Sequence, residues 1–288
     1  MQHSARADDT SAVAVIHDGH KTFLKWHRAR RRYSDTVFTG RRIVEGLRLG
    51  ASVEVDLQRH GSGGFAILHD TTLDRETSGT GPVAACCGDQ LRTLKLRGNE
   101  GRVGSESLML LEDLAALLSS EGLHPEARLQ LDLKNGSDDL EPRDVEAFVT
   151  AVSPVAAGIV LSGGDANAVE RLAAGVPEMP VGFDPCYDSL LLDLAKQKTY
   201  GRFVETVVSA MPRASMIYLH HRLVCSVADD GVNLIDAFHR AGKTVDAYTI
   251  GQATPESLPV LQRLISLGAD QITTDDPEGV AVALKALQ

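Results

Sequence analysis

Two carboxylates stand two residues apart in a stretch that alternates between apolar and polar residues. Glu54 and Asp56 lie in residues 52–58, and such alternation is typical of a strand whose successive side chains point to opposite faces. If their shared face is the interior of a barrel, this pair and Asp132 on a later predicted strand need a cation to stay ionised. An oxygen-only site of this kind suits Mg²⁺ or Ca²⁺. An outward face paired with surface lysines is the alternative.

Two histidines stand where predicted strands end. His27 is followed by Arg28, and His69 is followed by Asp70. Since imidazole titrates near neutral pH, such a pair could divide the work of a general base and a general acid. Arg28 and Lys134 could clamp a phosphate, although a lone cation is usually solvated. Spacing alone also admits other histidines: His17, His20, His60, His220, His221 and His239.

The elements that must position these groups alternate along the chain. Predicted strands cover residues 22–27, 52–58, 65–69, 128–134, 158–161, 180–183, 215–219, 244–250 and 271–273. Predicted helices cover residues 35–49, 110–119, 142–152, 166–174, 189–198, 232–241 and 255–267. This order predicts an α/β fold, a TIM (β/α)₈ barrel, with a doubly wound sheet as the competing architecture. Polar residues gather at the C-terminal ends of several strands, which favours the barrel because those ends meet at one face.

The chain of 288 residues is long enough for one such barrel, so we expect a single domain over residues 1–288. Residues 1–21 are interpreted as an N-terminal leader. Residues 70–107 are glycine-rich and weakly periodic, and we expect them to form a small inserted subdomain after the second β/α region. Insertions at this face commonly select the substrate, so we expect this one to set substrate size and not chemistry.

Composition excludes several classes of protein. A net charge of −10 argues against a nucleic-acid partner, although a local basic cluster can still bind a small phosphate ligand. No apolar run approaches the roughly 20 residues of a membrane helix, and the N-terminus lacks the pattern of a secretory signal. The four cysteines show no C-x-x-C pair and are expected to be reduced. We therefore expect a cytoplasmic protein without stable membrane insertion.

Six motifs in order give the chain a resemblance to the glycerophosphodiester phosphodiesterase family, which shares a barrel superfamily with phospholipases of the sphingomyelinase D type. The family's H-R-G, E-x-D-V, H-D with L-x-R-T-T-x-G, E-x-K, W-T-V-N and T-D-x-P motifs have counterparts from about Trp26 to the C-terminus. These read His27-Arg28-Ala29, Glu54-Val55-Asp56-Leu57, His69-Asp70 with Leu73-Asp74-Arg75-Glu76-Thr77-Ser78-Gly79, Asp132-Leu133-Lys134, Tyr248-Thr249-Ile250-Gly251 and Thr274-Asp275-Asp276-Pro277.

The resemblance implies a phosphoric diester hydrolase of lipid metabolism that acts on a small-molecule phosphodiester. By this resemblance His27 and His69 are catalytic, and Glu54, Asp56 and Asp132 hold the Mg²⁺ or Ca²⁺. We expect His27 to act as base and His69 as acid. The remaining predicted site residues are Arg28 and Lys134, which would bind the phosphate, and Tyr248, which would line the substrate pocket.

The chain departs from the family pattern at several points. Its counterpart of the P-E-N-T stretch is Tyr33-Ser34-Asp35-Thr36, which lacks the glutamate. Asp132 is one methylene shorter than the usual glutamate, and Tyr248 replaces a tryptophan that lines the pocket. The arginine run 30–32 is either a solvated loop or extra charge for a second anionic group.

These departures leave three functions to compare. The first is hydrolysis of a glycerophosphodiester to glycerol 3-phosphate and an alcohol by paired histidines. The second is cleavage through a cyclic phosphate, as in lysophospholipase D and sphingomyelinase D relatives. The third is a barrel that binds a phosphorylated ligand without catalysis; the histidine pair argues against this, because binding alone needs no acid and base.

Overall fold

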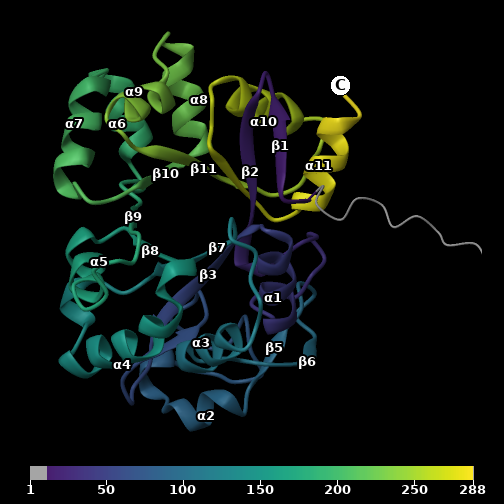
Figure 1. The fold of residues 1–288 in the computed structure, drawn as a ribbon, viewed down its shortest axis with the longest axis vertical. Coiled ribbons are helices and arrows are strands. Elements are labelled where there is room, and N and C mark those ends of the chain that lie inside the picture. Colours follow the sequence, from purple (N-terminus) through teal and green to yellow (C-terminus); the bar gives the residue numbers. More distant parts are fainter. Residues whose placement is uncertain (1–11, 288) are drawn as a thin grey trace, which may run out of the picture.

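In a computed structural model that describes residues 12–287, eight parallel strands form a barrel (Figure 1). They follow one another around the barrel in the order β8-β7-β3-β2-β12-β11-β10-β9, and a parallel bridge between Leu161 and Val181 joins β8 to the segment that leads into β9. The predicted TIM barrel is therefore confirmed, and the doubly wound sheet is not. The strands are β2 (His20–Trp26), β3 (Ser52–Arg59), β7 (Arg128–Leu133), β8 (Ile159–Gly163), β9 (Gly182–Phe183), β10 (Met216–His220), β11 (Thr244–Ile250) and β12 (Gln271–Thr274).

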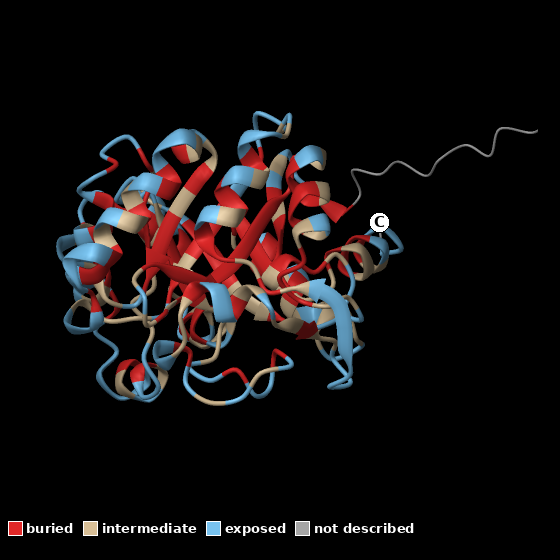
Figure 2. Cartoon of the chain, turned by 90° about the horizontal axis from the view of Figure 1, so that it is seen from below, coloured by how far each residue is buried: buried red, intermediate tan, exposed pale blue. Residues whose placement is uncertain are grey.

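Helices surround these strands, and Figure 2 shows that their outer faces are exposed while the strands are buried. They are α1 (Gly40–Leu49), α3 (Leu111–Ser119), α4 (Pro142–Val152), α5 (Ala166–Ala173), α6 (Leu190–Gln197), α7 (Tyr200–Ala210), α8 (His221–Asp229), α9 (Leu234–Arg240), α10 (Leu258–Ser266) and α11 (Pro277–Lys285). Sequence analysis missed α7, α8 and α11. Short 3₁₀ turns cover η2 (His27–Ala29), η4 (Ser137–Asp139) and η5 (Ser153–Gly158). No helix in residues 12–287 is long and apolar enough to cross a membrane.

The packing of strand β3 shows which of its side chains point into the barrel. A Cβ atom added to Gly46 of α1 would lie 2.7 Å from Val53 Cγ2, so the valine side of the strand packs closely on the helix. Side chains alternate along a strand, so Glu54 and Asp56 point to the barrel interior. They are 4% and 1% exposed, which excludes the alternative of an outward, solvated pair.

The barrel begins earlier than the sequence analysis expected. Residues 12–21, assigned there to the leader, form strand β1 (Ala14–His17) and the start of β2, which pair as an antiparallel hairpin. Trp26 Nε1 donates a hydrogen bond to the Ala12 carbonyl at 3.0 Å, and Val13 is buried. This segment is therefore part of the packed fold, because its apolar residues cover the barrel. The rest of the predicted leader, residues 1–11, lies outside the described residues.

The excursion after β3 begins with β4 (Phe65–Ile67), which pairs antiparallel with β3. The segment 70–107 then contains η3 (Val83–Ala85), α2 (Gly88–Arg92) and a hairpin of β5 (Lys95–Arg97) and β6 (Val103–Ser107). Leu91 and Leu96 are fully buried and belong to the same apolar cluster as the barrel helices. The segment therefore packs on the barrel, while its role in substrate size stays a prediction.

A polar layer lies inside the barrel beneath its C-terminal mouth. Lys25 of β2 and Asp246 of β11 form an ion pair of 3.0 Å between side chains that are 2% and 0% exposed. The Asp246 carboxylate also accepts hydrogen bonds from Gln271 and Thr273 of β12. A buried charge is stable only when it is paired and hydrogen-bonded, and this network meets both conditions. This network holds the polar layer in place directly beneath the residues of the mouth.

Candidate active site

A cavity of about 250 Å³ opens where the C-terminal ends of the barrel strands meet. Of the predicted site residues, all but Asp56 line it, and Asp56 lies buried directly beneath. The lining residues are Lys25, His27, Arg28, Glu54, His69, Gln130, Asp132, Lys134, Asp184, Tyr218, Tyr248, Thr249 and Thr273. The structure thus brings together side chains that are separated by more than 200 residues in the sequence.

The predicted carboxylates converge at one side of this cavity. Ligand atoms of Glu54, Asp56 and Asp132 all lie within 4.8 Å of one another. Lys134 Nζ lies 2.7 Å from Asp56 Oδ1 and also hydrogen-bonds Asp132. Burial and the charge of Asp56 raise the pKa of Glu54 well above its usual range. Burial opposes ionisation of Asp56 too, but Lys134 and Arg28 outweigh it and lower its pKa.

This cluster fits a hard divalent cation. Both carboxylate oxygens of Asp56 are buried, yet neither accepts a hydrogen bond of good geometry. Ser162 of β8 donates a hydrogen bond of 2.6 Å to Asp132 Oδ1, which fixes the shorter acid in place. Carboxylate oxygens are the ligands that Mg²⁺ and Ca²⁺ prefer. The donor set therefore suits either ion, and the identity of the ion stays a prediction.

His27 sits in a tight turn directly after β2. Its Nδ1 atom lies 2.6 Å from Asp275 Oδ1, so the ring presents Nε2 as its other nitrogen. Burial lowers the pKa of His27, although Asp275 opposes this effect. Arg28 and Ala29 have φ values of 52° and 59°. This left-handed turn directs the Arg28 main-chain N–H to Glu54 Oε2 at 2.7 Å, and it explains why glycine suits the position of Ala29.

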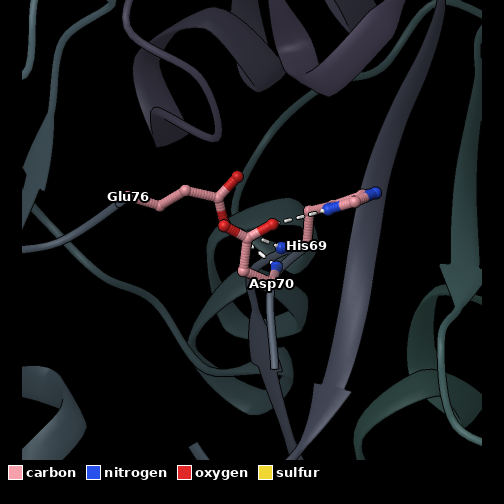
Figure 3. A group of neighbouring side chains, drawn as sticks. All are labelled: His69, Asp70 and Glu76. Carbon is pink, nitrogen blue, oxygen red and sulfur yellow. Dashed lines mark hydrogen bonds and ion pairs between the residues drawn. The ribbon is translucent and has the colours of Figure 1, made fainter. Parts of the chain in front are cut away.

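His69 follows β4 and is held in place by the carboxylates of Asp70 and Glu76 (Figure 3). Its Nδ1 atom lies 2.9 Å from Asp70 Oδ1, and Arg75 lowers the pKa of Asp70 to about 2. Glu76 Oε2 accepts the main-chain N–H groups of His69 and Asp70 at 3.1 and 3.2 Å. His69, Asp70 and Glu76 also lie close enough together to resemble a metal site. The oxygens of Asp70 and Glu76, however, already accept hydrogen bonds from N–H and guanidinium donors. The grouping is therefore explained as a hydrogen-bonded turn that positions His69.

Sequence reasoning missed Glu76, although a signal was present. The residue is 3% exposed and stands where the family motif carries its first threonine. An acid inside a motif of small polar residues is the feature that could have identified it. Asp275 was noted as part of a motif, but its contact with His27 depends on β12 lying beside β2, which local spacing does not reveal.

The two predicted phosphate ligands are also in the mouth. Arg28 reaches towards two buried acids over long distances, 3.4 Å from Asp56 Oδ2 and 3.5 Å from Glu76 Oε1. Its buried Nε atom is the one that faces Asp56, without a hydrogen bond of good geometry. A guanidinium group that is only loosely paired and lines the cavity beside Lys134 is suited to a phosphate oxygen. Their binding of phosphate stays a prediction.

The arginine run next to His27 is paired with acids of other elements, and Arg32 at its end is also exposed to solvent. Arg30 pairs with Asp275, and Arg31 pairs with Glu45 and Glu278, each at 2.7 Å. Arg32 lies 2.7 Å from the same Glu278. The run therefore ties the turn after β2 to α1 and to the start of α11.

We call the residues described so far the charged half of the mouth: His27, Arg28, Glu54, Asp56, His69, Asp132 and Lys134, which come from β2, β3, β7 and the turn after β4. Across the cavity lies an aromatic half, made of Asp184, Tyr218 and Tyr248 from β9, β10 and β11. Asp184 was not predicted. Its signal was modest, an acid directly after a predicted strand.

The rival histidines lie elsewhere. His17 and His20 belong to the β1–β2 hairpin, and His60 is buried in the turn between β3 and β4. His239 pairs with Asp270. His220 and His221 stack on each other beside Tyr248, outside the cavity lining. Within the described residues, His27 and His69 are thus the histidines that line the cavity with the acidic cluster.

Comparison with known proteins agrees with this geometry. A crystal structure of a glycerophosphodiester phosphodiesterase from Agrobacterium tumefaciens is 20% identical, covers 91% of this chain and 99% of its own, and superposes with a TM-score of 0.65. A phosphodiesterase from Oleispira antarctica, solved in complex with the product sn-glycerol-3-phosphate, is 21% identical, with coverages of 91% and 96% and a TM-score of 0.66. A Thermotoga maritima glycerophosphodiester phosphodiesterase is 15% identical, with coverages of 93% and 99% and a TM-score of 0.61.

These structures establish the shared fold. No curated protein matches the chain. The model of the glycerophosphoryl diester phosphodiesterase family matches residues 43–279. This match confirms the predicted enzyme class, a phosphoric diester hydrolase. Because it spans most of the chain, the chain belongs to the glycerophosphoryl diester phosphodiesterase family.

Proposed function

We propose that this protein hydrolyses glycerophosphodiesters to sn-glycerol 3-phosphate and an alcohol in a reaction that depends on a divalent cation. The observation that carries the proposal is the meeting of three carboxylates, two cationic side chains and two carboxylate-paired histidines at one cavity. The product complex of the Oleispira antarctica phosphodiesterase supports this choice of product. A cytoplasmic location and a place in lipid metabolism remain predictions from the sequence.

The cation would be held by Glu54, Asp56 and Asp132. When bound, it supplies Lewis-acid chemistry that offsets the negative charge of the phosphate. The Arg28 guanidinium group lines the cavity for a second phosphate oxygen, and Lys134 adds positive charge at the same side. Together these groups bind and orient the phosphodiester, and they stabilise the charge that develops as the new bond to phosphorus forms.

The surroundings of the two histidines support different roles. Burial lowers the pKa of His27, so its ring is neutral at neutral pH and can take a proton from water through Nε2. The water oxygen then bonds to phosphorus while the bond from phosphorus to the leaving alcohol breaks. His69 Nδ1 lies against Asp70, whose carboxylate stays ionised and orients the ring. His69 therefore donates the proton that the leaving alkoxide needs.

The test is a substrate panel with product analysis. The full chain is incubated with glycerophosphodiesters and lysophospholipids, with Mg²⁺ and Ca²⁺ supplied separately, and products are followed by phosphorus NMR. The proposal expects sn-glycerol 3-phosphate and the free alcohol. A cyclic phosphate would show that a substrate hydroxyl is the nucleophile. Tight binding without any turnover would contradict the proposal and indicate a barrel that only binds phosphate.

A further inference from the structure

The aromatic half of the mouth contains a carboxylate that the proposed reaction does not use. Asp184 follows β9, lines the cavity, and is only partly exposed. Its Oδ1 atom accepts the main-chain N–H of Cys186 at 2.9 Å. The Tyr248 hydroxyl and the Cys186 thiol also interact with the carboxylate and partly offset the effect of burial on its pKa. An ionised carboxylate offers about four acceptor positions, so these donors leave part of its capacity unused.

Within residues 12–287, Asp184 forms no ion pair. The lysines and the arginine that line the cavity pair with other acids. Lys25 pairs with Asp246, Lys134 with Asp56 and Asp132, and Arg28 with Asp56 and Glu76. Burial raises the pKa of Asp184 to about 6, so the group is still mostly ionised at neutral pH. A half-buried carboxylate that has no cationic partner can accept further hydrogen bonds, and a ligand in the cavity can donate them.

The position of Asp184 indicates which part of a substrate it meets. The charged half, across the cavity, holds the phosphate under the proposed function, so the aromatic half faces an alcohol part of the diester. The glycerol part is common to all glycerophosphodiesters and must be recognised by fixed groups, whereas the leaving alcohol varies and has to depart. Asp184 is fixed by Cys186 and by Tyr248, and a vicinal pair of hydroxyls supplies two donors of the kind it lacks.

We propose that Asp184, held in place by the Tyr248 hydroxyl, recognises the two free hydroxyls of the substrate's glycerol part. This inference rests on the proposed function. It gives a reason for tyrosine at position 248, where the family carries tryptophan, because only tyrosine brings a hydroxyl that fixes the carboxylate. Asp184 is thus a specificity-determining residue, and the charged half performs the chemistry.

The experiment compares two diesters that differ only in these hydroxyls: the p-nitrophenyl ester of glycerol 3-phosphate and propyl p-nitrophenyl phosphate. We expect the wild type to prefer the glycerol ester by about 10²-fold in kcat/KM, because the propyl ester leaves the charged carboxylate without both hydroxyl donors. Asp184→Asn should reduce this preference at least tenfold, with the larger loss of rate on the glycerol ester. Tyr248→Phe should act in the same direction with a smaller effect.

Asp188→Asn is the matched control, because Asp188 is an exposed acid on the same loop. It should leave the preference unchanged. Equal losses on both esters in Asp184→Asn, or no preference in the wild type, would overturn the inference. Calorimetry with sn-glycerol 3-phosphate and propyl phosphate separates it from the proposed function. Loss of the binding preference in Asp184→Asn without hydrolysis of any diester would sustain the inference and refute the function.

Discussion

The two halves of the barrel mouth are built on different principles. In the charged half every acid or histidine has an oppositely charged or hydrogen-bonding partner before any ligand arrives, as His27 has Asp275 and His69 has Asp70. In the aromatic half Asp184 is held only by neutral donors, and its neighbours Tyr218 and Tyr248 are uncharged. Under the two proposals above, the charged half is organised in advance for one reaction, while the aromatic half is completed by its ligand.

This difference shows how one barrel can keep its chemistry and change its substrate. Preorganised charges stabilise a transition state because they need not rearrange during the reaction. A single carboxylate with unused acceptor positions can select among substrates, because a ligand without hydroxyls leaves those positions without hydrogen bonds. Changes in the charged half, and then at the residues that support it, test this division.

Removal of the divalent cation should have the largest effect. Without a cation, burial and the neighbouring Asp56 raise the pKa of Glu54, so the cluster cannot hold all its charges. Excess EDTA should abolish turnover, and Mg²⁺ or Ca²⁺ should restore it. Full activity in EDTA, with no tightly held metal by elemental analysis, would show that the cluster is not a metal site.

Replacement of either cavity histidine should come next. His27→Ala and His69→Ala should each reduce the rate by about 10²- to 10⁴-fold, the usual contribution of general acid–base catalysis. Circular dichroism should show an intact fold. His17→Ala and His20→Ala, in the β1–β2 hairpin, are the controls and should be nearly silent. A dead His17→Ala enzyme with a normal His27→Ala enzyme would contradict the assignment.

Much of the charged half could be predicted because its residues sit in short local motifs. A two-residue spacing on a strand already places Glu54 and Asp56 on one face, and a strand end places His27 and His69 at the mouth. The alternation of strands and helices likewise predicted the barrel. Helix α8 was missed because it starts at His221, directly after β10, and leaves no loop between the two elements.

The supports and the aromatic half could not be predicted in the same way. Asp275 meets His27 only because the last barrel strand closes beside the first, and Asp184 meets Tyr248 across β10. Residues 12–21 are packed because β1 pairs with β2. The polar residues at the ends of this segment gave no sign of that pairing. The contacts of Asp275 and Asp184 are set by the order of the strands around the barrel, and no local pattern carries them.

Asp275→Asn should show how much of the activity depends on the orientation of the His27 ring, since the histidine itself is kept. An amide cannot fix the ring as the carboxylate does, so we expect kcat/KM to fall by about 10- to 10³-fold, less than or equal to the loss in His27→Ala. His27 must be neutral to act as base, and its pKa lies below the ordinary 6.5, so activity should decline only below that pH. Asp275 raises this pKa, so the acid limb should move to lower pH in the variant. A shift to higher pH would contradict the assignment of His27 as base.

Glu76→Gln should have the smallest effect and should act through His69. The amide oxygen can still accept the main-chain N–H groups of His69 and Asp70, but the charge that faces Arg28 and Arg75 is lost. A slightly displaced His69 delivers its proton poorly, so kcat on an alkyl diester should fall about tenfold. A p-nitrophenyl ester should lose little, because its leaving group departs without a proton. The control is Glu106→Gln, an exposed acid on β6, which should change neither rate. Equal losses on both esters would mean that Glu76 acts on phosphate binding through Arg28 and not on the acid.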